Sequence, residues 1–419
     1  MIQEQNLRYN FAAVSDKDTY NYVHFFDGRD SYLKRMYNAI DNSPTLQSII
    51  SKKNAFVLGK GFIAEPKDNN LIQNEEIGQE LDNKQVDQLN GYLKEVNSNG
   101  ENINDILAPL INDYNSFGNC YLEFVKSNDS VHVFYRPFHE VRLKEVQDRT
   151  ESIRYCVVNR NFDTMSGVVG TAYKPFVVPL YPNFGEINGQ ERSILHLKRS
   201  KAGLEYYGLP SWVSAILWAE IEYKVAKYSQ SEFDNGFMPS ALIQMYAQGN
   251  NDQIQEALDL FSDEQTGTGN QAQIFTMLLE NGTEPAKVDL LSQKREGSYM
   301  NTLEYAERKI MQSESWSDAL MGNKAPGELG GSQNLRTELE YKYQELILPI
   351  QQFLSKRLLG PIIKEFFATL NQESNISLKF VKNIPVTLFG EIDVQSVLST
   401  DELREELDKQ PLEDGNINE

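Results

Sequence analysis

Two long helical patterns, with a segment of different character between them, constrain the fold of this chain most strongly. The first follows Gly208-Leu209-Pro210, and its apolar positions recur at three- and four-residue spacing: Val213, Ile216, Leu217, Ile221, Val225 and Tyr228. The second covers about Ser298 to Leu320, with one apolar face formed by Tyr299, Leu303, Ala306 and Ile310. Between them we expect a small α/β module with strands at 241–246, 274–279 and 288–291 and a helix at 253–261.

The chain before the first long helix mixes helical and strand patterns. Two helices are expected over 31–58, separated where Ser43 can act as N-cap and Pro44 can open the second. A polar stretch at 68–85 indicates a loop, and helices follow at 86–96 and 103–115. A half-buried strand is expected at 120–125, with further strand character at 131–143, 153–159 and 176–181. The predicted fold class is therefore α+β.

The chain behind the second long helix begins with a segment that is poor in regular structure. Residues 321–334 contain Pro326 and four glycines, which predicts a loop. A helix follows at 335–359, which Pro349 should kink, and helical character resumes at 361–370. A strand-like stretch at 376–388 and a charged tail at 399–419 complete the chain.

The charge of the chain bears on the partners it can hold. Lys and Arg total 40 against 60 Asp and Glu, a formal net charge of −20. Tight binding to phosphates needs a basic surface, so we expect no firm grip on nucleic acid. Acidity would suit a protein past which DNA slides, and it equally suits an ordinary acidic protein.

The sequence contains few features that indicate a cellular compartment. No run of about 18 apolar residues occurs, and the first residues form no secretion signal, so we expect no membrane contact. Cys120 and Cys156 are expected to be buried, reduced thiols.

Patterns typical of enzymes do not occur. The chain has no P-loop, no HExxH, no His/Cys spacing of a zinc site and no Gly-x-Ser-x-Gly elbow. Its four histidines are expected to be structural. The tail carboxylates alternate with Arg404 and Lys409, which indicates a solvated face. We predict no catalytic residue, no metal ligand and no cofactor.

Several motifs follow one another over nearly the whole chain: Asn42-Ser43-Pro44 with Gly59-Lys60-Gly61, Phe117-Gly118-Asn119-Cys120-Tyr121, Arg136-Pro137-Phe138, Ile194-Leu195-His196-Leu197-Lys198 with Tyr207-Gly208-Leu209-Pro210, and Ser399-Thr400-Asp401-Glu402. In this order they resemble the portal proteins of tailed bacteriophages. The chain departs from the family at Cys120, where the family has Ala, and at Asp401, where it usually has Asn.

The resemblance implies a ring of about twelve subunits at one capsid vertex. It implies a portal-like fold with an α+β wing at 1–207, stem helices at 208–236 and 294–320, an α/β clip at 237–293, and an inner wing helix and helical crown at 335–398. Residues 321–334 become the candidate tunnel loop, with five candidate channel residues in or beside it: Lys324, Gly327, Gly330, Gly331 and Arg336. The loop would project into the channel and contact DNA transiently, and any direct grip, through Lys324 or Arg336, would be weak, local and salt-sensitive.

The resemblance also implies a function and partners. The ring would be a channel for DNA packaging and ejection and a docking platform for terminase and for a head-tail connector or adaptor. It would contact major capsid and scaffolding proteins, reside at the portal vertex of the virion and in the host cytoplasm during assembly, and let double-stranded DNA pass non-specifically. Two alternatives stay open: a virion-associated nucleic-acid enzyme, which magnesium-dependent cleavage or ATP hydrolysis would reveal, and another structural adaptor.

Overall fold

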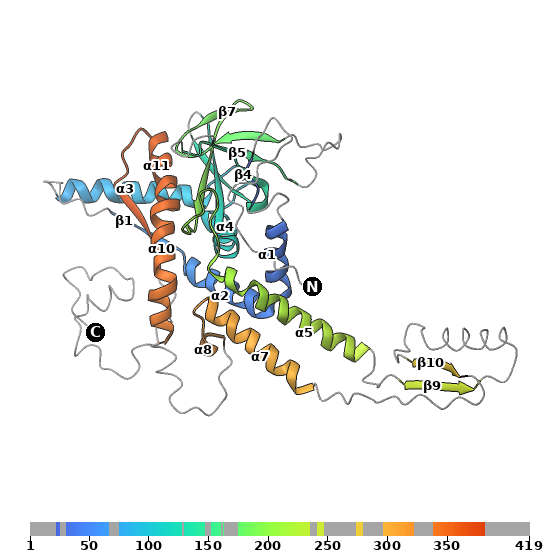
Figure 1. Ribbon diagram of the computed structural model, residues 1–419. Coiled ribbons are helices and arrows are strands. Elements are labelled where there is room, and N and C mark those ends of the chain that lie inside the picture. The colour runs from blue at the N-terminus through green and yellow to red at the C-terminus, as the bar shows by residue number, and fades with distance from the viewer. Residues whose placement is uncertain are drawn as a thin grey trace, which may run out of the picture. The chain divides into compact units, whose positions relative to one another are not determined.

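The chain divides into two units in a computed structural model (Figure 1): unit 1 comprises Met1–Ser214 and Met311–Glu419, and unit 2 comprises Ala215–Ile310. The structure describes residues 22–25, 31–66, 75–127, 130–146, 152–160, 162, 175–234, 241–246, 274–279, 296–321 and 338–381. Helices and strands are both abundant in these ranges, which confirms the α+β class.

The first two helices of unit 1 are those expected from the sequence. Helix α1 covers Ser31–Asn42 and α2 covers Pro44–Leu58. The Ser43 hydroxyl accepts a hydrogen bond from the Leu46 amide at 3.2 Å, and the proline occupies the first helical position, where no amide donor is needed. Helix α2 ends at Gly59, whose φ of 62° lies in the left-handed region.

The next helix is longer than expected. Helix α3 spans Glu75–Lys94, so the loop predicted at 68–85 is wrong from residue 75 onward. Glu, Gln, Leu and Lys are good helix formers even where no apolar stripe marks the helix. Helix α4, at Ile103–Phe117, starts where expected and ends two residues later than expected, and a capping box between Asn102 and Asp105 fixes its start.

A four-stranded antiparallel sheet lies next to α4. Its order is β3 (Val131–Arg136), β2 (Asn119–Lys126), β8 (Gln190–Lys198) and β7 (Gly185–Ile187). The half-buried prediction for β2 is wrong, because seven of its eight residues are buried. Leu122 and Phe124 face the main core, whereas Tyr121 stacks on Phe138 on the other side. Strand β8 is the second central strand of the sheet. Its residues 194–198 were identified in the sequence only as part of a motif.

Two smaller sheets complete unit 1. Strands β4 (Val141–Leu143), β5 (Tyr155–Val158) and β6 (Phe176–Pro179) pair antiparallel within the predicted ranges. Strand β1 (Phe62–Pro66) pairs antiparallel with β11 (Ile376–Phe380), with Phe62 opposite Phe380. The stretch 382–388, predicted to continue β11, lies outside the described residues.

One C-terminal helix, residues 338–369, replaces the two helices expected there. It contains α10 (Leu348–Leu354) and α11 (Gly360–Thr369), separated and preceded by π-helical segments at Tyr343–Ile347 and Ser355–Leu359. Pro349 and Pro361 each follow such a segment. Since proline has no amide donor and its ring crowds the preceding turn, a wider turn before each proline accommodates it without ending the helix.

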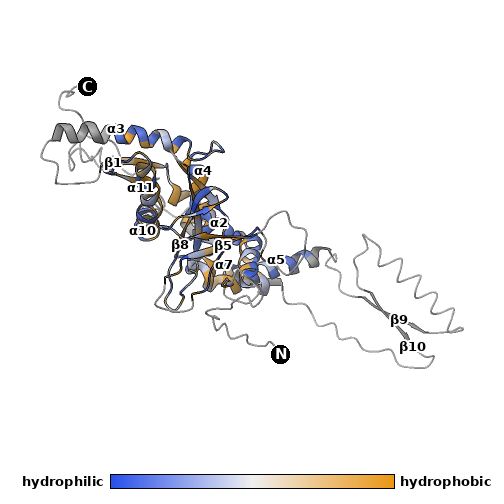
Figure 2. Ribbon diagram, turned by 90° about the horizontal axis from the view of Figure 1, so that it is seen from above, coloured by the Kyte–Doolittle hydropathy of each residue, from blue (hydrophilic) through white to orange (hydrophobic). Residues whose placement is uncertain are grey.

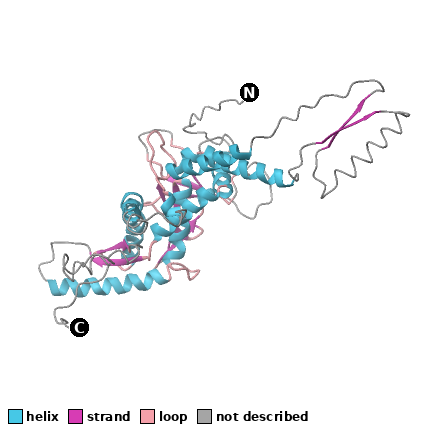
Figure 3. Cartoon of the chain, turned by 90° about the horizontal axis from the view of Figure 1, so that it is seen from below, coloured by secondary structure: helices cyan, strands magenta, loops and turns pink. Residues whose placement is uncertain are grey.

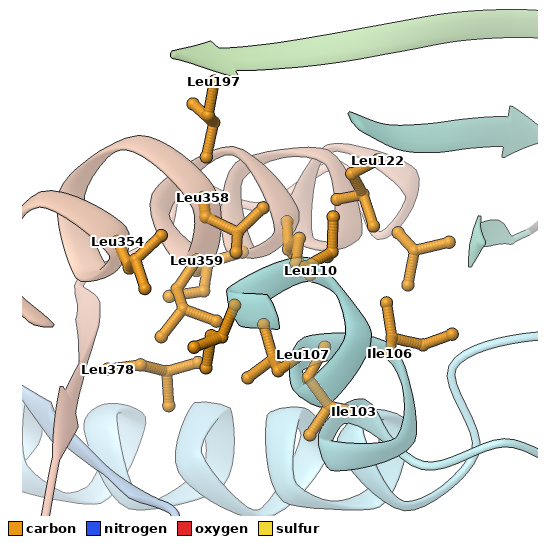
Figure 4. Packing of buried hydrophobic residues seen from close by; sticks show 14 of the residues in the cluster. Ile103, Ile106, Leu107, Leu110, Leu122, Leu197, Leu354, Leu358, Leu359 and Leu378 are labelled. Atoms are coloured by element: carbon orange, nitrogen blue, oxygen red, sulfur yellow. The ribbon is translucent and has the colours of Figure 1, made fainter. Parts of the chain in front are cut away.

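The main core of unit 1 lies between α4, β2, β8 and the C-terminal helix (Figure 4). Figure 2 shows hydrophobic residues gathered around α4 and α11, while the described part of α3 is mostly hydrophilic outside. In Figure 3, strands β1 and β11 lie beside helix α3, which contacts both of them. The Lys126 ammonium reaches the buried Glu365 carboxylate at 2.6 Å, so an ion pair ties the sheet to α11.

Unit 2 contains two long helices and a parallel pair of strands. Helix α5 covers Ile216–Asp234, continuing a 3₁₀ turn at Ser211–Ala215, and α7 covers Glu296–Ser313. They are antiparallel neighbours, because Trp218 contacts Tyr305 and Tyr228 stacks on Tyr299. Strands β9 (Ala241–Tyr246) and β10 (Ile274–Leu279) have the predicted bounds. The predicted helix at 253–261 and strand at 288–291 lie outside the described residues.

Two predictions about the long helices are wrong in detail. Helix α7 ends at Ser313 rather than near Leu320, because Ser315 adopts a φ of 52° and the chain turns into a short helix α8, Asp318–Met321. The apolar stripe of α5 is also not a buried stripe throughout. Leu217 is 60% exposed, whereas Glu222, placed off the stripe, is buried.

Candidate functional site

The structure brings together two of the sequence motifs. The turn Gly118-Asn119, between α4 and β2, lies against Gly208-Leu209-Pro210, which leads into α5. The Arg199 amide donates to the Gly118 carbonyl at 2.7 Å, and the Leu209 amide donates to the Arg199 carbonyl at 3.3 Å. A Cβ on Gly118 would lie 2.4 Å from the Leu209 carbonyl carbon, and one on Gly208 would lie 2.5 Å from the Gly118 oxygen. Only glycine fits at this backbone crossing.

Asn119 satisfies the polar groups of the crossing. Its side-chain amide donates to the carbonyls of Phe117 and Gly208, both at 2.9 Å, and its oxygen accepts from the Gly208 amide at 2.8 Å. This pattern fixes the orientation of the amide. The third neighbour, His196 Nε2 at 3.1 Å from the same oxygen, must therefore be the donor.

His196 is a structural histidine, as the sequence suggested. Its ring stacks on Tyr121 with 4.7 Å between centroids, inside the protein. Burial, reinforced by the charge of Lys198, lowers the pKa of His196 to about 3. The ring stays neutral at physiological pH and is not available as a proton carrier there.

A second cluster lies where the chain leaves unit 1 and where it returns. The Lys53 ammonium of α2 lies 2.6 Å from the Glu314 carboxylate, and both side chains are at most 4% exposed. The Ser211 hydroxyl, close to the end of the first segment of unit 1, donates a hydrogen bond to Glu314 and accepts hydrogen bonds from Lys53 and Arg199. We call Lys53, Arg199, Ser211 and Glu314 the clasp. Burial lowers the pKa of Lys53, and the facing carboxylate of Glu314 opposes that effect.

The clasp adjoins the start of the segment predicted to be a loop. The Lys52 ammonium donates to the carbonyls of Leu320 and Met321, at 3.1 and 2.9 Å, at the end of α8. Leu320 and Leu339 line one small apolar pocket, together with Phe56, Trp316 and Tyr343. Both ends of the segment 322–337 are therefore held close together, against α2.

The five candidate channel residues lie in this segment. Lys324, Gly327, Gly330, Gly331 and Arg336 are all outside the described residues, so their placement stays a prediction. The structure shows instead how the two ends of the segment are anchored, by the Lys52 hydrogen bonds and by the small apolar pocket. The sequence reasoning missed Lys52, Lys53 and Glu314, although one signal was present: Lys53 follows Leu46, Ile49 and Ile50 at helical spacing and precedes Val57, which places it on the apolar face.

Both cysteines and Asp113 are buried within the fold. Cys120 and Cys156 are free and buried, as predicted, and burial raises the pKa of both thiols. Burial also raises the pKa of Asp113 to about 7, against hydrogen bonds from Tyr135 and the Phe138 amide that lower it. Nowhere in the described ranges do three or more His, Cys, Asp or Glu side chains gather where they could ligate a metal ion.

None of the helices in the same ranges is both long and apolar enough to cross a bilayer.

No family model and no curated protein matches the sequence. The fold, however, is similar to that of solved chains. One, in the neck of an empty GTA particle computed with C6 symmetry, is 16% identical, covers 91% of this chain and 94% of its own length, and has a TM-score of 0.55. Another, in the virion of a native gene transfer agent (GTA) particle, is 17% identical with the same coverages and a TM-score of 0.53. At the level of the fold, these likenesses confirm the resemblance identified from the motifs.

Proposed function

We propose that the chain is a portal subunit that forms a closed ring, of about twelve copies, at one vertex of a tailed-phage-like capsid. The ring is a channel for DNA packaging and ejection. It docks terminase, a head-tail connector and capsid proteins, and it performs no catalysis. The shared fold with a chain in a GTA neck computed with C6 symmetry supports this assignment, because a twelve-membered ring satisfies sixfold symmetry.

The observation that carries the proposal is the exposed apolar surface of the long helices. Nine large hydrophobic residues are exposed in the described ranges, and five of them lie on α5 and α7. Leu217 is 60% exposed, Met300 58% and Tyr305 51%. A contiguous exposed apolar surface marks a site that another protein covers, and we infer that these residues of α5 and α7 belong to such a surface. In a ring of identical subunits, the neighbouring copy covers it.

In this proposal the domains keep the bounds expected from the sequence, with stem helices formed by α5 and α7 and the clip between them. The tunnel loop is the segment 321–334, which lies outside the described residues from residue 322 onward. DNA passes without being held, because about twelve copies, each with a formal charge of −20, surround it with net negative charge.

Ring formation tests the proposal directly. The purified chain is expected to form rings near twelvefold at micromolar concentration, and Leu217→Glu together with Met300→Glu is expected to leave folded monomers. Each substitution removes an apolar contact worth about 1.5–3 kcal/mol at every interface and buries a charge there. Native mass spectrometry and negative-stain images give the readout.

Tyr155→Glu is the matched control, because Tyr155 is 49% exposed but lies on β5 in unit 1, whereas Leu217 and Met300 belong to unit 2. It should leave the rings intact. A wild-type chain that stays monomeric at these concentrations would refute the ring.

The loop has its own test. Deleting residues 327–331 is expected to preserve the rings while lowering the amount of DNA that particles package or retain, because the anchors at Leu320 and Leu339 remain. Lys52→Met, which removes the anchor at the end of α8, should cause a smaller loss. DNA content per particle is measured after nuclease treatment. Particles that fill and hold a complete genome without residues 327–331 would show that the segment is only a surface connection.

A further inference from the structure

A groove runs along one face of the C-terminal helix, beside β11. Its volume is about 960 Å³. Helix residues at three- and four-residue spacing form one wall, among them Leu348, Gln352, Lys356, Ile363 and Lys364, and residues 372–380 form the other. The groove lies wholly within unit 1. Its floor is apolar, because Ile363, Ile376 and Leu378 contribute to it.

The charge of this groove is opposite to that of the chain. Lys356, Lys364 and Lys379 line it, against one acidic residue, Glu373. Lys356 and Lys364 are exposed. A surface with excess positive charge in a protein of net charge −20 favours an acidic occupant, and the apolar floor favours one that also carries hydrophobic side chains.

The chain carries a segment with both properties. Residues 398–409 contain five carboxylates and two basic residues, and Leu403 and Leu407 are four residues apart, so they would share one face of a helix. Amphipathic segments of this kind bind in apolar grooves through such leucines.

The segment can also reach the groove. Strand β11 borders the groove and ends at Phe380, and the residues between Phe380 and Leu398 can span about 60 Å when extended. The groove follows the helix from Leu348 to Ala368, about 30 Å. Tethering at this distance raises the effective concentration of the segment to the order of millimolar.

We propose that this groove binds the acidic segment 398–409 of the same chain. Leu403 and Leu407 pack on the apolar floor, and the carboxylates around them pair with Lys356 and Lys364. The proposal does not depend on ring assembly, and a monomeric chain would test it equally well.

Zero-length cross-linking of the full-length chain tests the contact. A carbodiimide joins a lysine amine to a carboxylate only where the two touch, and peptide mass spectrometry identifies the pair. We expect cross-links from Lys356 and Lys364 to carboxylates in 401–408. Mixing ¹⁴N- and ¹⁵N-labelled protein separates links within a chain, which we expect, from links between copies, which would overturn the assignment to the same chain.

Leu403→Asp with Leu407→Asp should reduce these links at least about tenfold, although it adds carboxylates, because it removes both apolar contacts. Ile417→Asp is the control, since it makes the same kind of change beyond the segment and should have no effect. Links that survive the leucine substitutions, or that spread equally to the exposed Lys224 and Lys227 of α5, would show mere charge attraction and overturn the proposal. Loss of the links on adding a short DNA duplex at submicromolar concentration would identify a nucleic-acid site instead.

Discussion

Gly118→Ala is expected to lower the free energy of unfolding by about 3 kcal/mol or more. Two effects add. Gly118 has a φ of 70°, where a Cβ costs about 1 kcal/mol, and its Cβ would meet the backbone of Leu209 and Pro210 at 2.4–2.8 Å. Backbone atoms cannot rotate away as a side chain does, so the crossing must open. Denaturant unfolding followed by circular dichroism measures the loss.

Two other glycines separate these effects. Gly100 has a φ of 73° with nothing within 4 Å of its Cβ position, so Gly100→Ala should cost only about 1 kcal/mol. Gly208→Ala tests the close approach to Arg199 and Gly118 alone. Its matched control is Gly91→Ala in α3, which should be neutral or slightly stabilising. Equal losses at Gly118 and Gly100 would contradict the tight crossing.

The clasp predicts the second large effect. Lys53→Met and Glu314→Leu each break the buried pair. Each should lower the free energy of unfolding by about 3–5 kcal/mol, because an unpaired charge then remains inside the protein. Glu314→Leu should be the more costly change, since it leaves Lys53 beside the positive charge of Arg199. The double variant should lose less than either single variant, because two apolar side chains then replace the pair.

Unfolding free energies of the four proteins in this cycle give the coupling between the two residues. The more exposed pair Lys342–Glu345, with side chains 20% and 43% exposed, provides the control, and Lys342→Met with Glu345→Leu should show a coupling below about 0.5 kcal/mol. Additive losses at Lys53 and Glu314 would mean that the two charges do not stabilise each other.

Local patterns in the sequence were sufficient for much of the fold. The Ser43-Pro44 start of α2, the start of α4 at Ile103 and the bounds of β9 and β10 depend on residues close to one another in the chain, and all were predicted correctly. The order of the motifs along the chain also indicated the family that the chain resembles, and the fold of this chain is similar to that of a solved neck chain. Periodicity and capping record interactions over a few residues, so a sequence alone carries them.

Only the tertiary structure determined which motifs meet. Gly118 and Gly208 are unremarkable in the sequence, and their requirement for glycine arises because two backbones cross there. Lys53 stood on an apolar face with no visible partner until Glu314, 261 residues later, was placed beside it. The burial of β2 on both faces likewise depends on Phe138 and on the core around α4, which pack on opposite sides of it. Such contacts join distant segments, and their energies depend on distances and burial that no local pattern records.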